Sequence, residues 1–66
     1  MNALDLIAAA KARAAAEGRV AANGATYRTV EAKQWHDGFK AARKTGALDK
    51  AAFARREQTL RNAGKW

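Results

Sequence analysis

Residues 46–53 read GALDKAAF, and this stretch decides the fold because it contains both a helix stop and a helix start. Gly46 is the residue type that most often follows a helix, and Asp49 is a favoured N-cap. Leu48 precedes that cap, where it can pack on Phe53 at the fourth helical position as a hydrophobic staple. The stretch therefore predicts a helical hairpin, whose second helix begins after Asp49 and runs to about residue 62.

The first helix of this hairpin is predicted from its N-cap, Thr29, to about Lys44. Apolar residues recur in it at spacings of three, four and three, which places them on one helical face: Ala32, Trp35, Phe39 and Ala42. We expect this face, with both aromatic rings, to form the core. On another line of the same helix Asp37 lies one turn from Lys33 and can pair with it.

Residues 3–17 predict a further helix, because an alanine-rich run with Asp5 in its first turn suits both helix propensity and the helix dipole. Its apolar stripe consists of Ala3, Ile7, Ala10 and Ala14, with Leu4 and Leu6 beside it. After Ile7 the stripe holds only alanine, so this helix stabilises the fold weakly.

Residues 18–29 have two interpretations. Asn23-Gly24 is typical of a two-residue β-hairpin turn, which would place Val20 opposite Tyr27. Alternatively, the first helix continues through Gly18 and ends at Asn23 or Gly24 as a left-handed cap. Both remain open, so the predicted class is mainly α: a small three-helix module, with or without a short β-hairpin at about 19–28.

The chain has 66 residues, which predicts a single small basic helical domain over 1–66 with a thin core. It contains no cysteine, so neither a disulfide nor a thiolate metal site is available. The N-terminal stretch lacks the basic head and apolar run of a signal peptide, and no stretch has the length of a membrane span. We therefore expect a cytoplasmic protein that does not engage a membrane.

The formal net charge is +7, and it is unevenly placed. Residues 1–34 carry five basic and three acidic side chains, whereas residues 35–66 carry eight and three. The C-terminal half is therefore the more strongly charged surface. Such a field attracts polyanions and acidic protein faces through long-range steering.

Residues 36–60 resemble the short C-terminal domain (SHOCT) family, a helical hairpin of about thirty residues. The resemblance rests on the turn 46–49 and on residues at matching positions in the two helices: Phe39, Ala42, Phe53, Arg56 and Leu60. The chain departs from the family in having Lys50-Ala51-Ala52 where acidic residues are usual, and His36 where a leucine is usual. The resemblance implies a hairpin used for self-association or for tethering to a macromolecule, and no chemistry.

Enzymatic activity is not expected. His36 and Asp37 are adjacent, but neighbours in a helix point about 100° apart and do not face each other. The chain has no serine and only one histidine, so no nucleophile, base and orienting group can be assembled. Metal-ligating residues do not cluster either, and we predict no metal site and no cofactor.

The residues with functional content are basic. We predict that they contact a nucleic acid backbone or an acidic protein partner: Lys40, Arg43, Lys44, Arg55, Arg56, Arg61 and Lys65. Few polar residues of these helices could read bases, Gln58 and Asn62 being the candidates, so the leading hypothesis is binding without strong sequence specificity.

The alternative hypothesis is a small regulatory or assembly protein, of the kind found as bacterial or phage accessory proteins, that docks on an acidic protein face. Trp66 and Leu4 are the predicted interface anchors. Trp66 suits either such a docking anchor or a lid that closes the core, while Trp35 is expected inside the core. Homo-oligomerisation is a further option for so small a core.

Overall fold

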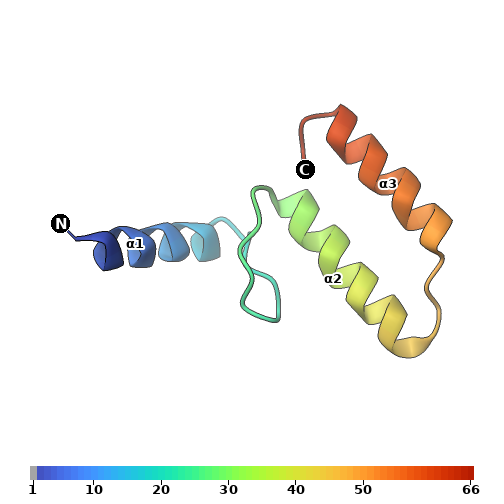
Figure 1. Ribbon diagram of the computed structural model, residues 1–66, viewed down its shortest axis with the longest axis horizontal. Coiled ribbons are helices and arrows are strands. Elements are labelled where there is room, and N and C mark those ends of the chain that lie inside the picture. The colour runs from blue at the N-terminus through green and yellow to red at the C-terminus, as the bar shows by residue number, and fades with distance from the viewer. Residues whose placement is uncertain (1) are drawn as a thin grey trace.

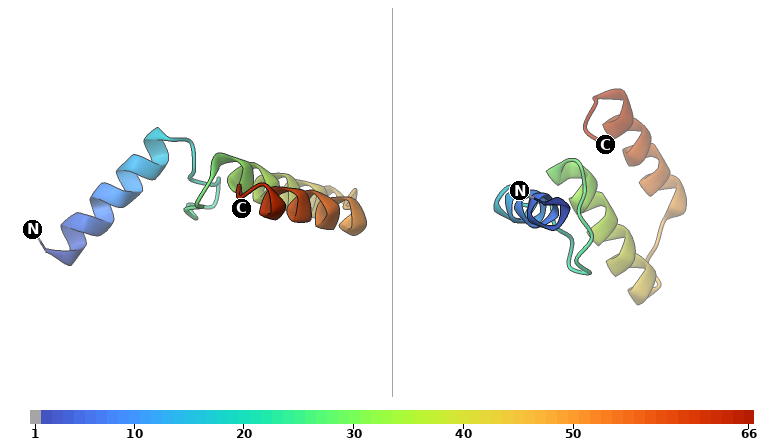
Figure 2. Two further views of the ribbon diagram at one scale, coloured as in Figure 1. Left: turned by 90° about the horizontal axis from the view of Figure 1, so that it is seen from above. Right: turned by 60° about the vertical axis from the view of Figure 1, so that its left-hand side comes forward.

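The computed structural model describes residues 2–66 and contains three helices, α1 (Ala3–Ala16), α2 (Val30–Thr45) and α3 (Lys50–Asn62). Helices α2 and α3 lie side by side and antiparallel, while α1 projects away from them (Figure 1). A second direction of view shows the same separation (Figure 2). The prediction of a small, mainly α, three-helix module is confirmed.

The predicted caps that define the hairpin are confirmed. The Thr29 hydroxyl accepts a hydrogen bond from the backbone N–H of Ala32 at 3.0 Å, and the Asp49 carboxylate accepts one from Ala52 at 3.1 Å. Gly46 follows α2 with a φ of 76°, in the left-handed region that favours glycine. The sequence stretch 46–53 therefore turns the chain back on itself as predicted.

Helix α1 begins with a capping box that the sequence prediction missed. The side chain of Asn2 accepts a hydrogen bond from the backbone N–H of Asp5 at 2.9 Å, and the Asp5 carboxylate accepts one in return from the backbone of Asn2. At the other end, the backbone N–H of Arg19 donates to the carbonyl of Ala14 at 2.8 Å, closing the helix around Gly18. The predicted extension of this helix to residue 23 or 24 is therefore wrong.

The segment between α1 and α2 turns back on itself in a small hairpin-like loop with an isolated antiparallel bridge between Val20 and Thr26. The predicted pairing of Val20 with Tyr27 is wrong by one residue, because the loop has three residues rather than two. The backbone N–H of Ala21 donates to Ala25 at 2.8 Å, and Gly24 has a φ of 86°. This is a type I turn followed by a left-handed glycine, which shifts the pairing register.

The core of the hairpin is built around Trp35, which is 8% exposed. Its ring stacks on Phe39 with centroids 5.2 Å apart, and meets the Phe53 ring edge to face at 5.6 Å. The indole N–H also donates to the backbone carbonyl of Phe53 at 2.9 Å. The predicted core position of Trp35 is confirmed, and this side chain connects α2 directly to α3.

Within residues 2–66, α2 and α3 are the helices that pack against each other. Helix α1 contacts the rest of the chain through its C-terminal end, where Ala14 is fully buried. Near its N-terminus Leu4 is 74% exposed, Leu6 57% and Ile7 53%. The predicted apolar stripe of α1 is therefore covered at one end and open at the other.

Two glycine substitutions, one inside α2 and one just after it, are expected to change the stability of the hairpin in opposite directions. At Gly46 the backbone is left-handed, so Gly46→Ala should lower the free energy of unfolding by about 1 kcal/mol. Gly38 lies inside the helix, and an added Cβ would meet the Phe53 ring at 3.7 Å, an ordinary contact. Gly38→Ala should therefore raise stability by about 0.5 kcal/mol. Urea denaturation of both variants measures the two changes, and a neutral Gly46→Ala would contradict the left-handed cap.

Candidate functional site

The seven predicted basic site residues are all exposed in the structure. They are distributed over the end of α2, the length of α3 and the segment after it: Lys40, Arg43, Lys44, Arg55, Arg56, Arg61 and Lys65. Exposure leaves all of them accessible to a partner.

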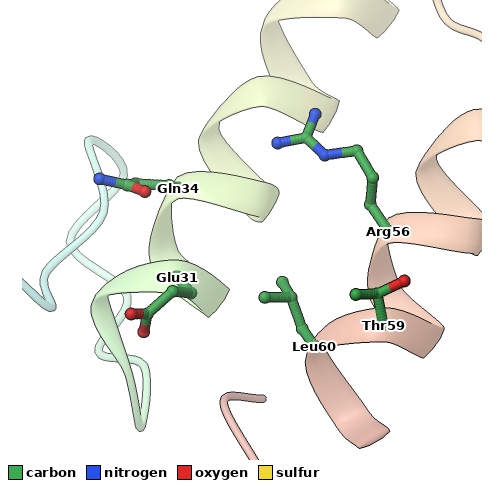
Figure 3. Close-up of a pocket in the computed structure, with 5 residues that line it drawn as sticks. All are labelled: Glu31, Gln34, Arg56, Thr59 and Leu60. Atoms are coloured by element: carbon green, nitrogen blue, oxygen red, sulfur yellow. The ribbon is translucent and has the colours of Figure 1, made fainter. Parts of the chain in front are cut away.

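These residues do not form one surface. Arg56 lines a groove of about 300 Å³ between α2 and α3, together with Glu31 and Leu60 (Figure 3). Leu60 projects into this groove, and the Arg56 guanidinium reaches toward α2. Arg61 instead lines a separate hollow with Trp66, while Arg55 points about 100° away from Arg56 as its helical neighbour. The hairpin therefore carries positive charge on more than one side.

The hollow beside Trp66 has a volume of about 350 Å³ and is lined by Arg28, Arg61, Gly64 and Trp66. The Arg61 guanidinium lies over the Trp66 ring, 5.0 Å from its centroid, and its Nε also donates to the Glu57 carboxylate at 2.8 Å. This hollow brings two arginines to one aromatic ring. The Arg56 groove, in contrast, has no aromatic side chain in its lining.

Arg28 is the residue of this hollow that the sequence prediction missed. It precedes Thr29, the N-cap of α2, and therefore lies at the end of the hairpin that the last residues of the chain also reach. The Thr29 hydroxyl donates to the backbone carbonyl of Lys65, and the N–H of Lys65 donates to Leu60 at 2.8 Å. These bonds bring the segment after α3 back to the start of α2. Since the Thr29–Lys65 bond joins residues 36 positions apart, spacing along the chain gave no indication of it.

A row of half-buried rings continues from the hollow; we call Tyr27, His36 and Trp66 the aromatic row. Tyr27 and His36 stack with centroids 4.3 Å apart and planes 16° apart. His36 and Trp66 are 5.2 Å apart and tilted by 41°. Behind them, Trp35 meets Trp66 edge to face at 5.1 Å, so the row rests on the core.

Basic side chains flank the aromatic row. Lys40 and Arg43 follow His36 along α2 at spacings of four and seven residues, which keeps them on the same side of the helix. We define the Trp66 surface as the aromatic row together with the cations that line its hollow, follow His36 on the same side of α2 or precede Trp66 in the chain: Arg28, Lys40, Arg43, Arg61 and Lys65. The Trp66 surface therefore combines three rings with five positively charged side chains.

The adjacent residues His36 and Asp37 have different contacts, as expected for helical neighbours: His36 lies against aromatic rings, and Asp37 contacts a lysine. Asp37 pairs with Lys33 at 2.9 Å, which confirms the predicted ion pair. The hydrogen bond from Lys33 lowers the pKa of the Asp37 carboxyl below its usual value. Burial lowers the pKa of His36 below 6.5 and the charge of Lys40 adds to this, while Glu57 and Asp37 act in the opposite direction.

Few of the cations are neutralised within the chain. Ion pairs engage Arg19, Lys33 and Arg61. Since the chain has thirteen lysines and arginines, ten have no carboxylate partner in the described part of the chain, and all ten are exposed.

The two predicted interface anchors lie in different settings. Leu4 is on the open end of α1 and is largely exposed. Trp66 is half-buried and closes one side of the core against Trp35, the lid position that its sequence context allowed. An anchoring role for either residue stays a prediction.

Over residues 2–66, no three histidine, aspartate or glutamate side chains gather in a way that could hold a metal ion. No helix in the same range is long and apolar enough to cross a membrane. Comparison with known proteins gives no family model, no curated protein and no solved structure that matches this chain.

The lowered pKa of His36 predicts a pH-dependent stability. An unfolded histidine protonates near 6.5, whereas the folded one does so only at lower pH, so between the two values the unfolded state binds more protons. The stabilising contribution is complete above pH 6.5 and is lost as pH falls through the folded value. The melting temperature should therefore fall as pH is lowered from about 7.5 to about 5.

The matched variant is His36→Gln, which cannot titrate in this range. It should melt at a lower temperature, because it lacks the stacked ring, but its melting temperature should change much less between the same two pH values. Equal pH dependence in both proteins would contradict the assignment to His36.

Proposed function

We propose that this chain is a non-enzymatic protein that binds nucleic acid through backbone phosphates without strong sequence specificity. The observation that carries the proposal is the set of ten exposed cations without a carboxylate partner. Unpaired, exposed guanidinium and ammonium groups are the groups that contact phosphate and release its counterions. We place this activity in the cytoplasm, in keeping with a chain that has no cysteine.

The Trp66 surface is the proposed contact. Four of its cations are exposed and have no carboxylate partner: Arg28, Lys40, Arg43 and Lys65. The fifth, Arg61, forms an ion pair with Glu57. Arg56, on the other side of the hairpin, is turned away from a straight ligand bound at this surface. A rigid duplex would therefore contact about four or five of these cations at once, rather than all seven residues predicted from the sequence.

Low sequence specificity is consistent with the hydrogen bonding of the polar side chains on α3. Glutamine and asparagine read a base edge through two hydrogen bonds from one side-chain amide. The Gln58 amide donates to the Asn62 side chain at 2.8 Å, so the two candidates for base contacts are bonded to each other. A two-bond contact of the Gln58 amide with a base would have to break this bond, whereas the exposed cations can contact phosphate as they stand, which positions a ligand without specifying its sequence.

The open end of α1 favours a second candidate function. Leu4, Leu6 and Ile7 are more than half exposed and could dock in an apolar groove on another protein, as amphipathic helices do. In that case the chain would be a small regulatory or assembly protein whose cations complement an acidic face. Leu4→Ala would then weaken the complex strongly, whereas nucleic acid binding would be unaffected by this change.

Fluorescence anisotropy tests the leading proposal. Labelled duplex of random sequence is titrated with the protein at salt concentrations from about 50 to 200 mM. With about four or five phosphate contacts, the logarithm of the binding constant should fall with the logarithm of salt at a slope of about −4. If neither this duplex nor a labelled single strand bound even at low salt, the proposal would be refuted.

A charge-matched pair of variants locates the contact. Lys40→Gln with Arg43→Gln removes two cations from the Trp66 surface and should reduce the magnitude of the slope by about 2. Lys11→Gln with Arg13→Gln removes the same charge from α1, and should leave the slope nearly unchanged. Equal effects of the two double variants would show that net charge, and not this surface, governs binding.

A further inference from the structure

We infer that the nucleic acid bound at the Trp66 surface is single-stranded, with unpaired bases stacking against the aromatic row and the backbone held by the surrounding cations. This inference rests on the proposed nucleic acid binding and adds the class of nucleic acid. It uses a feature that phosphate contact alone does not need, the three half-buried rings at the surface.

The aromatic row offers an unpaired base places to stack at its ends. Tyr27 and His36 are stacked on each other at 4.3 Å, His36 lies tilted 5.2 Å from Trp66, and none of the three rings is fully buried. Because neighbouring rings cover the faces between them, a base extends the row and does not insert within it. Proteins that bind single strands combine such aromatic side chains with a positively charged groove that follows the backbone. Stacking is tolerant of sequence because every base has an aromatic face.

The hollow beside Trp66 provides the matching phosphate contacts. Arg28 and Arg61 line it together with the indole, and the hollow is open to solvent, so a backbone phosphate can reach both guanidinium groups. Arg61 already lies over the Trp66 ring, which shows that a planar cationic group fits against this ring. A base can stack on the outer side of that guanidinium, as bases do on arginine planes in single-stranded RNA complexes.

The row is rigid enough to present its rings without a ligand. Trp66 rests edge to face on the buried Trp35, and its neighbour Lys65 is bonded through its carbonyl to Thr29 and through its N–H to Leu60. Tyr27 is bonded through its carbonyl to the Arg19 guanidinium at 2.7 Å. Rings already held in place lose little conformational freedom when a base stacks on them.

A duplex cannot use this row in the same way. Its bases are stacked on one another and expose only their edges in the grooves, so the rings would face sugar and phosphate instead of base faces. The binding free energies of a duplex and of a single strand with equal numbers of phosphates would therefore differ by the contribution of base stacking. Stacking is worth about 1–3 kcal/mol per base, so one stacked base gives a preference of about tenfold.

The experiment compares an oligothymidine with a mixed-sequence duplex that has the same number of phosphates, by fluorescence anisotropy at one salt concentration. The whole chain should bind the single strand about tenfold more tightly. Intrinsic tryptophan fluorescence should be quenched by the single strand and much less by the duplex, because Trp66 is the more exposed of the two tryptophans.

Variants separate stacking from charge. Trp66→Leu should remove most of the single-strand preference and leave duplex binding within about twofold, and Trp66→Phe should restore the preference in part. Arg43→Gln should weaken binding to both ligands by the same factor. Circular dichroism of each variant confirms that the helices are retained, and the wild-type ratio of the two affinities tests the inference independently of any variant.

Each outcome bears on one proposal or on both. Equal or tighter binding to the duplex would overturn the single-strand inference while leaving nucleic acid binding intact. A Trp66→Leu variant that keeps its helices and loses affinity for both ligands equally would also overturn it, since the ring would then act only on the fold. Failure of the wild-type chain to bind either ligand at low salt would overturn the proposed function itself.

Discussion

The indole of Trp35 is the interaction on which the rest of the hairpin depends. It is the only large side chain among the buried residues of the described chain, the others being Ala14, Ala21 and Ala32. Its N–H is bonded to the backbone of α3, and its ring contacts Phe39, Phe53 and Trp66. Alanines bury too little apolar area to hold two helices together, so one aromatic residue supplies the central contact between α2 and α3.

A core of this size has a consequence for the surface. The chain is too short to enclose all of its rings, so Tyr27, His36 and Trp66 stay half-buried at the edge of the core. These rings therefore stabilise the fold and are available to a ligand at the same time. A ligand that bound these rings only in the folded state would also stabilise that state, so the proposed recognition would be coupled to folding.

The helices and their caps could be predicted from the sequence because they depend on local chemistry. The capping residues form their hydrogen bonds within one helical turn of their own positions: Thr29, Gly46 and Asp49. The spacing of Trp35 and Phe39 indicated which face of α2 belongs to the core. The pairing register of residues 19–27 was not predictable in the same way, because Asn23-Gly24 is compatible with turns of two or three residues. The hollow at Trp66 depends on contacts between residues far apart in the chain, and the contribution of Arg28 could not be found from spacing alone.

The distribution of charge argues for a flexible ligand rather than a stiff one. Arg56 and Arg61 lie on different sides of the hairpin, one in the groove with Glu31 and Leu60 and the other against Trp66. Duplex DNA is straight over the length of so small a protein, since its persistence length is about 150 base pairs, and it can therefore touch one side only. A single strand bends within a few nucleotides and can follow cations around the hairpin while its bases stack on the aromatic row. Because the arginines lie on different sides of the hairpin, a duplex can contact only some of the cations at once, whereas a single strand can contact more of them.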